Sequence, residues 1–165
     1  MSQHKISKQA LVALIISELK QELNQAISAA NEAHAAAVDD QSVAETQYDT
    51  LAIEASYLAE GQSRRVQALH TALHDYHTVN LVDFNKNSAL ALTALVQLAQ
   101  DEQEPHWFFI GPAAGGFRCI LSAQHITVIT PKSPMGLALI GKYQDDDIDI
   151  KLGNNQLTDY IAQVQ

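Results

Sequence analysis

The sequence predicts an α+β protein: an N-terminal antiparallel helical hairpin, a coiled coil, followed by a small, mostly antiparallel β domain that carries one short helix. Two observations predict this division. From Lys8 to about Leu73 the chain has no proline and a single glycine, Gly61, whereas the remainder holds all four prolines and the other six glycines. Apolar residues recur at heptad spacing in the first part, and they alternate with polar residues in the second. We therefore expect two domains, the hairpin at 1–77 and the β domain at 78–165.

The first helix is predicted by an apolar seam whose steps alternate between four and three residues, the pattern of a coiled coil. The seam consists of Val12, Ile16, Leu19, Leu23, Ala26, Ala30, Ala33 and Ala37. Large residues at its start give way to alanines, which predicts a slender distal end. About 30 residues at about 1.5 Å each make a prong about 45 Å long.

A short turn is expected at residues 38–42, which would send the second helix back along the first. Ser42 and Glu45 fit a capping box at the start of that helix: the Ser42 hydroxyl accepts from the Glu45 amide, and the carboxylate reaches back. The second seam is predicted to be Ala44, Tyr48, Leu51, Ala55, Leu58, Gln62, Val66, Leu69 and Leu73. Its additional four-residue step near Gln62 predicts a local stutter.

Six strands are expected in the second domain, at 89–99, 106–110, 117–121, 125–130, 148–152 and 157–164. The fifth is the clearest, because Ile148, Ile150 and Leu152 alternate with charged residues, and residues 153–155 then offer a turn. One short helix is expected after Ser133, a suitable N-cap, with Pro134 as its first residue and Gly141 as its stop.

The formal charge of −9 comes from 19 acidic and 10 basic residues, which argues against nucleic acid as the main partner. The acidity is uneven: residues 21–63 contain eight acidic residues and no Lys or Arg. The predicted prong is therefore suited to a basic or metal-containing cavity and ill suited to gripping RNA.

The single Cys119 can form neither an internal disulfide nor a Cys-based zinc site, and we expect it to be buried in a strand. No apolar run approaches the roughly 18 residues of a membrane span, and the first residues lack an apolar signal segment. We expect a cytoplasmic protein that does not contact a membrane.

Residues 133–142 read Ser-Pro-Met-Gly-Leu-Ala-Leu-Ile-Gly-Lys. Placed after a long helical hairpin, this segment resembles the Ser-Pro to Gly-Lys stretch in the C-terminal domain of the Gre family of bacterial transcription elongation factors. The resemblance covers most of the chain, including Tyr48 shortly after the hairpin tip. It implies an FKBP-like C-terminal domain that docks at the rim of the secondary channel of RNA polymerase. The docking residues implied are Ser133, Pro134, Met135, Gly136, Leu139 and Ile140.

In Gre proteins the hairpin reaches down the channel, and acidic tip residues help hold the second active-site Mg²⁺, so that backtracked transcripts are cleaved by metal-assisted hydrolysis. When the chain is aligned on Tyr48, Gln41 and Ala44 stand where the two acidic residues belong. Neither side chain supplies the anionic oxygen that Mg²⁺ prefers. The basic hairpin residues that touch the transcript in the family are absent as well.

Three other acidic residues, Asp39, Asp40 and Glu45, are candidates to act at the tip. Their alternative role is structural: negative charge stabilises a helix N-terminus, and Glu45 completes the capping box.

The resemblance thus implies a regulatory factor that binds RNA polymerase and inserts an acidic prong, with weak or no stimulation of transcript cleavage. We expect no enzyme activity of its own, no cofactor beyond a share in the polymerase Mg²⁺, no stable direct binding of nucleic acid, and a monomer. The alternative is a coiled-coil interaction module not linked to polymerase, whose hairpin pairs with another helix or with itself.

Other patterns each allow two interpretations. His70, His74 and His77 share one helical face at i, i+4 and i+7, so they could bind Zn²⁺ or Ni²⁺, or could simply stabilise the negative end of a helix. Residues 111–116 are glycine-rich but lack a phosphate-loop pattern, which indicates a loop. The aromatic residues of the second domain could line a pocket or form its core: Trp107, Phe108, Phe109, Phe117 and Tyr143.

Overall fold

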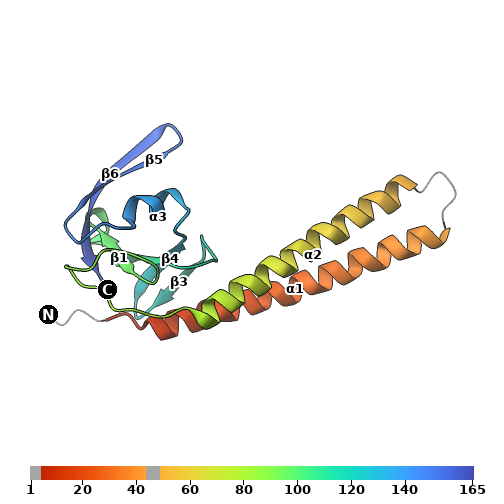
Figure 1. Ribbon diagram of the computed structural model, residues 1–165, viewed down its shortest axis with the longest axis horizontal. Coiled ribbons are helices and arrows are strands. Elements are labelled where there is room, and N and C mark those ends of the chain that lie inside the picture. The colour runs from red at the N-terminus through yellow and green to blue at the C-terminus, as the bar shows by residue number, and fades with distance from the viewer. Residues whose placement is uncertain (1–4, 44–48) are drawn as a thin grey trace. The chain divides into compact units, whose positions relative to one another are not determined.

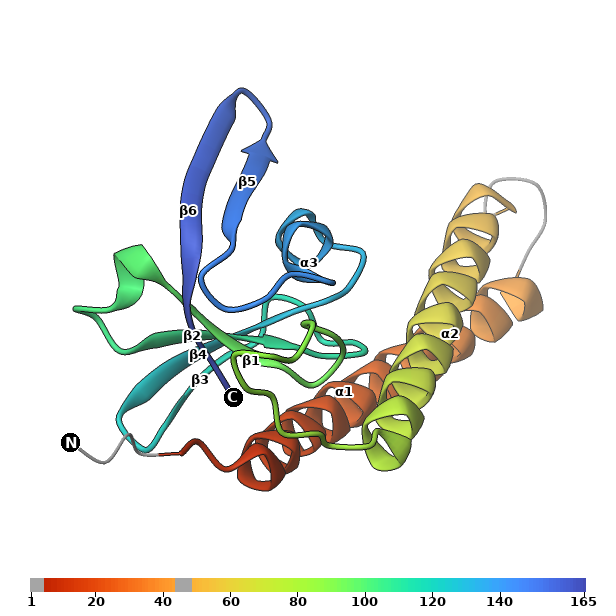
Figure 2. The same cartoon turned by 60° about the vertical axis from the view of Figure 1, so that its left-hand side comes forward.

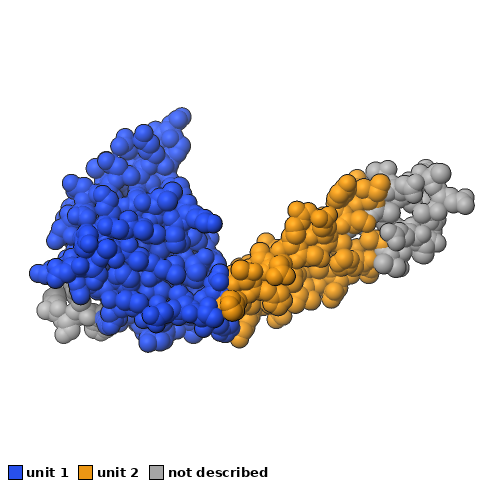
Figure 3. Space-filling view, in the orientation of Figure 1, with its two compact units in different colours: residues 1–15, 75–165 blue, residues 16–74 orange. Residues whose placement is uncertain are grey.

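The computed structural model describes residues 5–43 and 49–165, and it places the side chains of these residues except 38–43, 49–52 and 55. Two long helices, α1 (Lys8–Val43) and α2 (Asp49–Thr78), precede six strands and the short helix α3 (Pro134–Leu139) (Figure 1). The protein is therefore an α+β protein, as the sequence predicts. The chain forms two compact units, residues 1–15 with 75–165 (unit 1) and residues 16–74 (unit 2) (Figure 3). No helix in the described part of the chain is long and apolar enough to cross a membrane.

In unit 2, the seam predicted for α1 is confirmed. Leu19, Ala26, Ala30 and Ala37 are buried, and the remaining seam positions of this unit are half-buried. No proline or glycine interrupts the 36 residues of α1. Packing of this apolar seam therefore stabilises a continuous helix, because helices in proteins gain most of their stability from such contacts.

The seam predicted for α2 is wrong at Leu58, whereas Ala44 and Tyr48, and the side chains of Leu51 and Ala55, lie outside the described residues. Leu58 is 62% exposed, whereas the neighbouring Ala59 is 3% exposed. Ala59, Gln62, Val66, Leu69 and Leu73 are all buried or half-buried, with steps of three, four, three and four residues. The heptad phase therefore continues without a stutter in this part of the helix. A small residue occupies the seam where a larger one was expected, because helical phase outweighs side-chain size.

The turn expected at residues 38–42 is also wrong, because α1 continues through them to Val43. The segment contains no glycine or proline that would end a helix there. Ser42 lies within α1 and so does not cap the second helix, which begins at Asp49. Glu45, the other member of the expected capping box, lies outside the described residues.

Unit 1 is built on a six-stranded sheet with the order β3-β4-β2-β1-β6-β5 (Figure 2). The strands are β1 (Leu95–Leu98), β2 (His106–Ile110), β3 (Arg118–Leu121), β4 (Gln124–Ile129), β5 (Asp147–Leu152) and β6 (Asn155–Val164). Four of the five strand pairs are antiparallel, and β2 with β4 is the parallel one. The mostly antiparallel sheet expected from the sequence is thus confirmed.

One face of the sheet carries the main core. Ile110 and Ile129, neighbours in the β2–β4 register, belong to an apolar cluster with Leu139 of α3 and Ile150 of β5. Side chains alternate along a strand, so Phe109 and Val128 face the opposite side, and both are fully buried. The first turns of α1 lie on that opposite side of the sheet in both views (Figures 1 and 2).

The first expected strand, 89–99, is shorter in the structure. Leu90 pairs outside the sheet: its N–H donates to the carbonyl of Lys142, and its carbonyl accepts from the N–H of Gly141, both at 2.8 Å. Thr93 has φ of 77°, a left-handed conformation that a strand does not accommodate. Because of these hydrogen bonds and the conformation of Thr93, β1 begins only at Leu95.

Candidate functional site

The segment 133–142 begins with a capped helix. Ser133 adopts an extended conformation, and its Oγ accepts from the N–H of Gly136 at 3.0 Å. The same hydroxyl donates to the carbonyl of Thr130 at 2.7 Å. Pro134 follows at the first helical position, where its missing N–H costs nothing. The cap, the proline and α3 itself confirm the prediction from the sequence.

Gly136 has a steric role within α3. A Cβ at this position would overlap the carbonyl oxygen of Thr130, because the helix passes directly over the preceding loop. A glycine is therefore needed for the close approach of the two backbone segments.

The end of α3 is anchored as firmly as its start. Gly141 has φ of 80°, the left-handed conformation that ends many helices. Gly141 and Lys142 make the two backbone hydrogen bonds to Leu90 described above. The six residues of α3 are thus fixed at both ends, and their orientation within unit 1 is well defined.

The predicted docking residues divide between the interior and the surface. Gly136 and Leu139 are buried, and Met135 packs partly against the core cluster. Ser133 is half-buried with its hydroxyl engaged, whereas Pro134 is exposed and Ile140 is 40% exposed. Of the predicted set, Pro134 and Ile140 therefore present the largest apolar surface to solvent.

The structure adds an exposed residue that the sequence reasoning omitted. Leu137 is 70% exposed, more than any other large apolar side chain among the described residues. Its position could have been inferred: Met135 and Leu139, four residues apart, share the inward face, so a residue midway between them points outward. We call Pro134, Leu137 and Ile140 the α3 face.

The candidate tip acids fall partly outside the described residues. Asp39 and Asp40 lie within the backbone of α1, while their side chains, like Glu45 as a whole, fall outside the described residues. Arg64 and Arg65, which follow the stretch that lacks basic residues, form ion pairs. Arg64 lies 3.3 Å from Glu60 and Arg65 lies 3.4 Å from Glu22; the Glu22 side chain is partly buried and the other three are largely exposed.

The histidines of α2 do not assemble a metal site. Within the described residues, no group of three or more His, Cys, Asp or Glu side chains is placed to hold a metal ion, and His70, His74 and His77 fall within that part of the chain. His77 lies in the last turn of α2.

A polar cluster at the start of β2 was missed by sequence reasoning. His106 Nε2 lies 2.9 Å from Thr127 Oγ1, and His106 Nδ1 lies 3.7 Å from Asp101 Oδ1. Burial raises the pKa of the Asp101 carboxyl, although the nearby His106 opposes this shift. The cluster borders a recess of about 310 Å³ that is also lined by Cys119, and burial raises the pKa of that thiol. The residues of this cluster come from different segments of the chain, so their spacing in the sequence does not reveal that they meet.

Comparisons with known proteins yield structural similarity only. No protein-family model matches the chain, and no curated protein does. The crystal structure of GreA factor homolog 1 (Gfh1) of Thermus thermophilus aligns over 91% of this chain and 94% of its own, with 17% identity and a TM-score of 0.37. The structure of Thermus aquaticus Gfh1 covers 90% of this chain and 92% of its own, with 16% identity and a TM-score of 0.35. A likeness at this level assigns neither a family nor a function.

Proposed function

We propose that this protein is a Gre-like regulatory factor that binds RNA polymerase at its secondary channel. In this proposal the α3 face docks on the polymerase, and the acidic hairpin enters the channel. The observation that carries the proposal is the segment 133–142, which resembles the Gre stretch in sequence and forms a helix capped at both ends with an exposed apolar face. Exposed apolar side chains on a rigid support are typical of contact surfaces.

The proposed factor has no catalytic residues or cofactor of its own. Any chemistry would use the Mg²⁺ of the polymerase, with Asp39, Asp40 or Glu45 as the candidate acids of the hairpin. Because Gln41 and Ala44 replace the expected carboxylates, we propose that cleavage of backtracked transcripts is weak or absent.

Docking is tested by binding of the full chain to core polymerase, measured by a pull-down and by titration. Leu137→Ser is expected to weaken binding at least roughly tenfold, because a central exposed anchor often dominates an interface. Ile120→Thr is the matched control, since Ile120 is 63% exposed on β3 and lies outside the α3 face. If the wild type forms no complex, the proposal is wrong.

Cleavage is tested separately with stalled, backtracked complexes and sizing of the RNA ends. We expect little shortening by the wild type. Efficient shortening that disappears in an Asp39→Ala/Asp40→Ala double variant would contradict the weak-cleavage proposal and would identify these acids as the metal-directed pair.

The second candidate function is a coiled-coil module unrelated to polymerase. It would be favoured by a stable dimer that forms through the hairpin, detected by light scattering. A monomer that binds polymerase would exclude it.

A further inference from the structure

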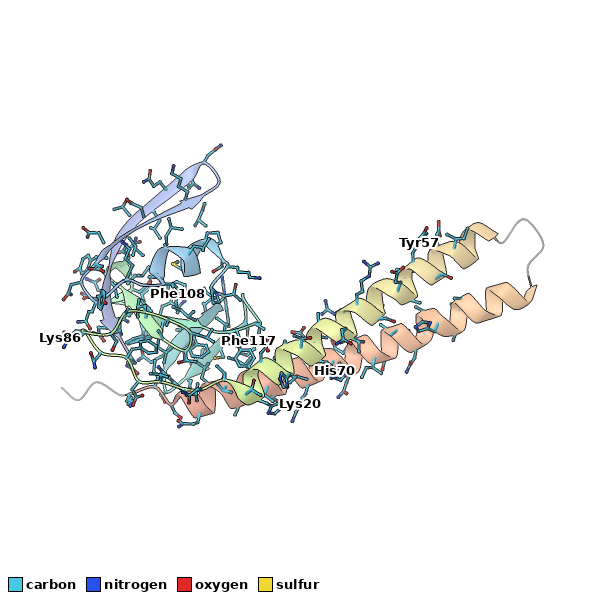
Figure 4. The ribbon with its side chains drawn as sticks, viewed as in Figure 1. Lys20, Tyr57, His70, Lys86, Phe108 and Phe117 are labelled. Atoms are coloured by element: carbon cyan, nitrogen blue, oxygen red, sulfur yellow. The ribbon has the colours of Figure 1, made fainter. Side chains whose placement is uncertain are left out.

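The distal part of α2 exposes three large apolar side chains within six positions. Ile53 is 54% exposed, Tyr57 is 69% exposed and Leu58 is 62% exposed. Ile53 and Tyr57 are four residues apart and so occupy one face of the helix, with Leu58 beside them. We call these three residues the apolar stripe. Figure 4 shows Tyr57 on the side of α2 that faces away from α1.

The stripe is not explained by packing among the residues of unit 2 that the structure describes. Ala59 and Gln62 occupy the seam toward α1, and Ala59 is buried there. Helix formation does not require residues of this size either, because Ile and Tyr are no better helix formers than Ser. Single exposed apolar residues are common on protein surfaces, but a cluster of this size indicates a contact surface.

The charge around the stripe identifies the kind of partner. Glu54 directly follows Ile53 and is exposed, and residues 21–63 contain eight acidic residues and no Lys or Arg. Glu60 lies two residues beyond Leu58, but it is paired with Arg64. Nucleic acid is repelled by such a surface, since binding to phosphates depends on basic side chains. A second copy of the chain would bring a second acidic hairpin against the first, and like charges held close together repel. A basic protein surface is attracted instead.

We propose that the apolar stripe is a contact surface for a basic protein surface that contains an apolar recess. This inference rests on the proposed function, under which the partner surface is the wall of the polymerase secondary channel. The stripe would then hold the hairpin by its side, independently of the tip acids. The apolar side chains would contribute affinity, and the surrounding acids would contribute attraction and orientation.

The test is an Ile53→Ser/Tyr57→Ser double variant of the full chain, titrated against core polymerase. We expect binding at least roughly tenfold weaker than wild type, with unchanged helical circular dichroism because serine matches the helix propensity of both residues. Ile27→Ser is the matched control: Ile27 is 37% exposed on α1, and its replacement is expected to leave affinity unchanged. Glu54→Gln should reduce the dependence of affinity on salt.

Each outcome separates the stripe from the proposed function. If the double variant binds as tightly as wild type while Leu137→Ser does not bind, the stripe proposal is wrong and the proposed function stands. If the wild type does not bind polymerase, both are wrong. A wild-type dimer that becomes monomeric in the double variant would identify a second copy as the partner, and would also overturn the proposal.

Discussion

Gly136 and Gly61 differ in the space that is available for a side chain. At Gly136 an added Cβ overlaps the backbone of Thr130, whereas at Gly61, in the middle of α2, it would meet nothing within 4 Å. Only the first position therefore has a steric reason for glycine.

Substitution of each glycine by alanine should have opposite effects on the free energy of unfolding. Gly136→Ala should destabilise by about 1–3 kcal/mol, because a backbone carbonyl must move to make room. Gly61→Ala should stabilise by about 0.5–1 kcal/mol, because alanine loses less conformational entropy in a helix. Urea unfolding followed by circular dichroism measures both. Equal effects at the two sites would contradict this steric account of Gly136.

Lys8 is a cation with little access to water. The residue is 5% exposed, and its Nζ donates to the carbonyl of Val82 at 2.6 Å and lies 4.9 Å from the centroid of the Phe84 ring. Burial lowers its pKa from 10.5 to about 8, although the nearby Asp83 opposes the shift. The folded protein therefore releases this proton at a lower pH than the unfolded chain does.

The pH dependence of stability follows from that shift. Between about pH 8 and pH 10.5 the unfolded chain binds more protons at this site, so its contribution to the free energy of unfolding rises with pH in that window. Below pH 8 the contribution is at its lowest. Lys8→Met should remove the rise, which is seen by subtracting the two stability profiles. Parallel profiles for wild type and variant would show that Lys8 is not the titrating group.

At the scale of single elements, local signals and long-range pairing differ in how well they can be predicted. The start of α3 is predicted correctly because Ser133 and Pro134 act within one helical turn. The parallel pairing of β2 with β4 was not predicted, because nothing within either strand specifies a partner at such a distance in sequence. Leu137 was missed for a different reason: resemblance to a motif does not distinguish the buried residues of a short helix, such as Leu139, from the exposed ones.

The α2 seam shows a similar limit. A pattern based on side-chain size selected Leu58, but the phase of the heptad placed Ala59 in the seam. Leu58 is the larger residue but lies on the surface, so side-chain size did not predict the seam. Assigning Leu58 to the seam also left the apolar stripe unrecognised in the sequence.

Two side-chain truncations in α2 test whether the seam excludes Leu58, as the structure shows, or includes it, as the sequence pattern predicts. Leu69→Ala removes a buried seam side chain and should cost about 2 kcal/mol or more, whereas Leu58→Ala should change stability by less than about 0.5 kcal/mol. Thermal unfolding of the helical signal measures both. A large loss at Leu58 would restore the seam that was predicted from sequence.

At the scale of the whole molecule, acidity and apolar contact surface are distributed in a specific way. The stretch from residue 21 to residue 63 carries eight of the 19 acidic residues and none of the 10 basic ones. The α3 face belongs to unit 1 and the apolar stripe to unit 2. A partner that engaged both would gain from linkage, because the second contact forms at a high effective concentration once the first is made.

Unit 1 is discontinuous in sequence, since its first 15 residues are separated from residue 75 onward by the whole of unit 2. Bringing these segments together requires closure of a long loop, whose entropic cost grows with the logarithm of its length. Early formation of the hairpin from contacts between its two helices shortens that loop, so the helices would assist folding of the sheet. Leu69→Ala should accordingly slow the burial of Trp107 during refolding, and an unchanged rate would show that the sheet closes without help from the hairpin.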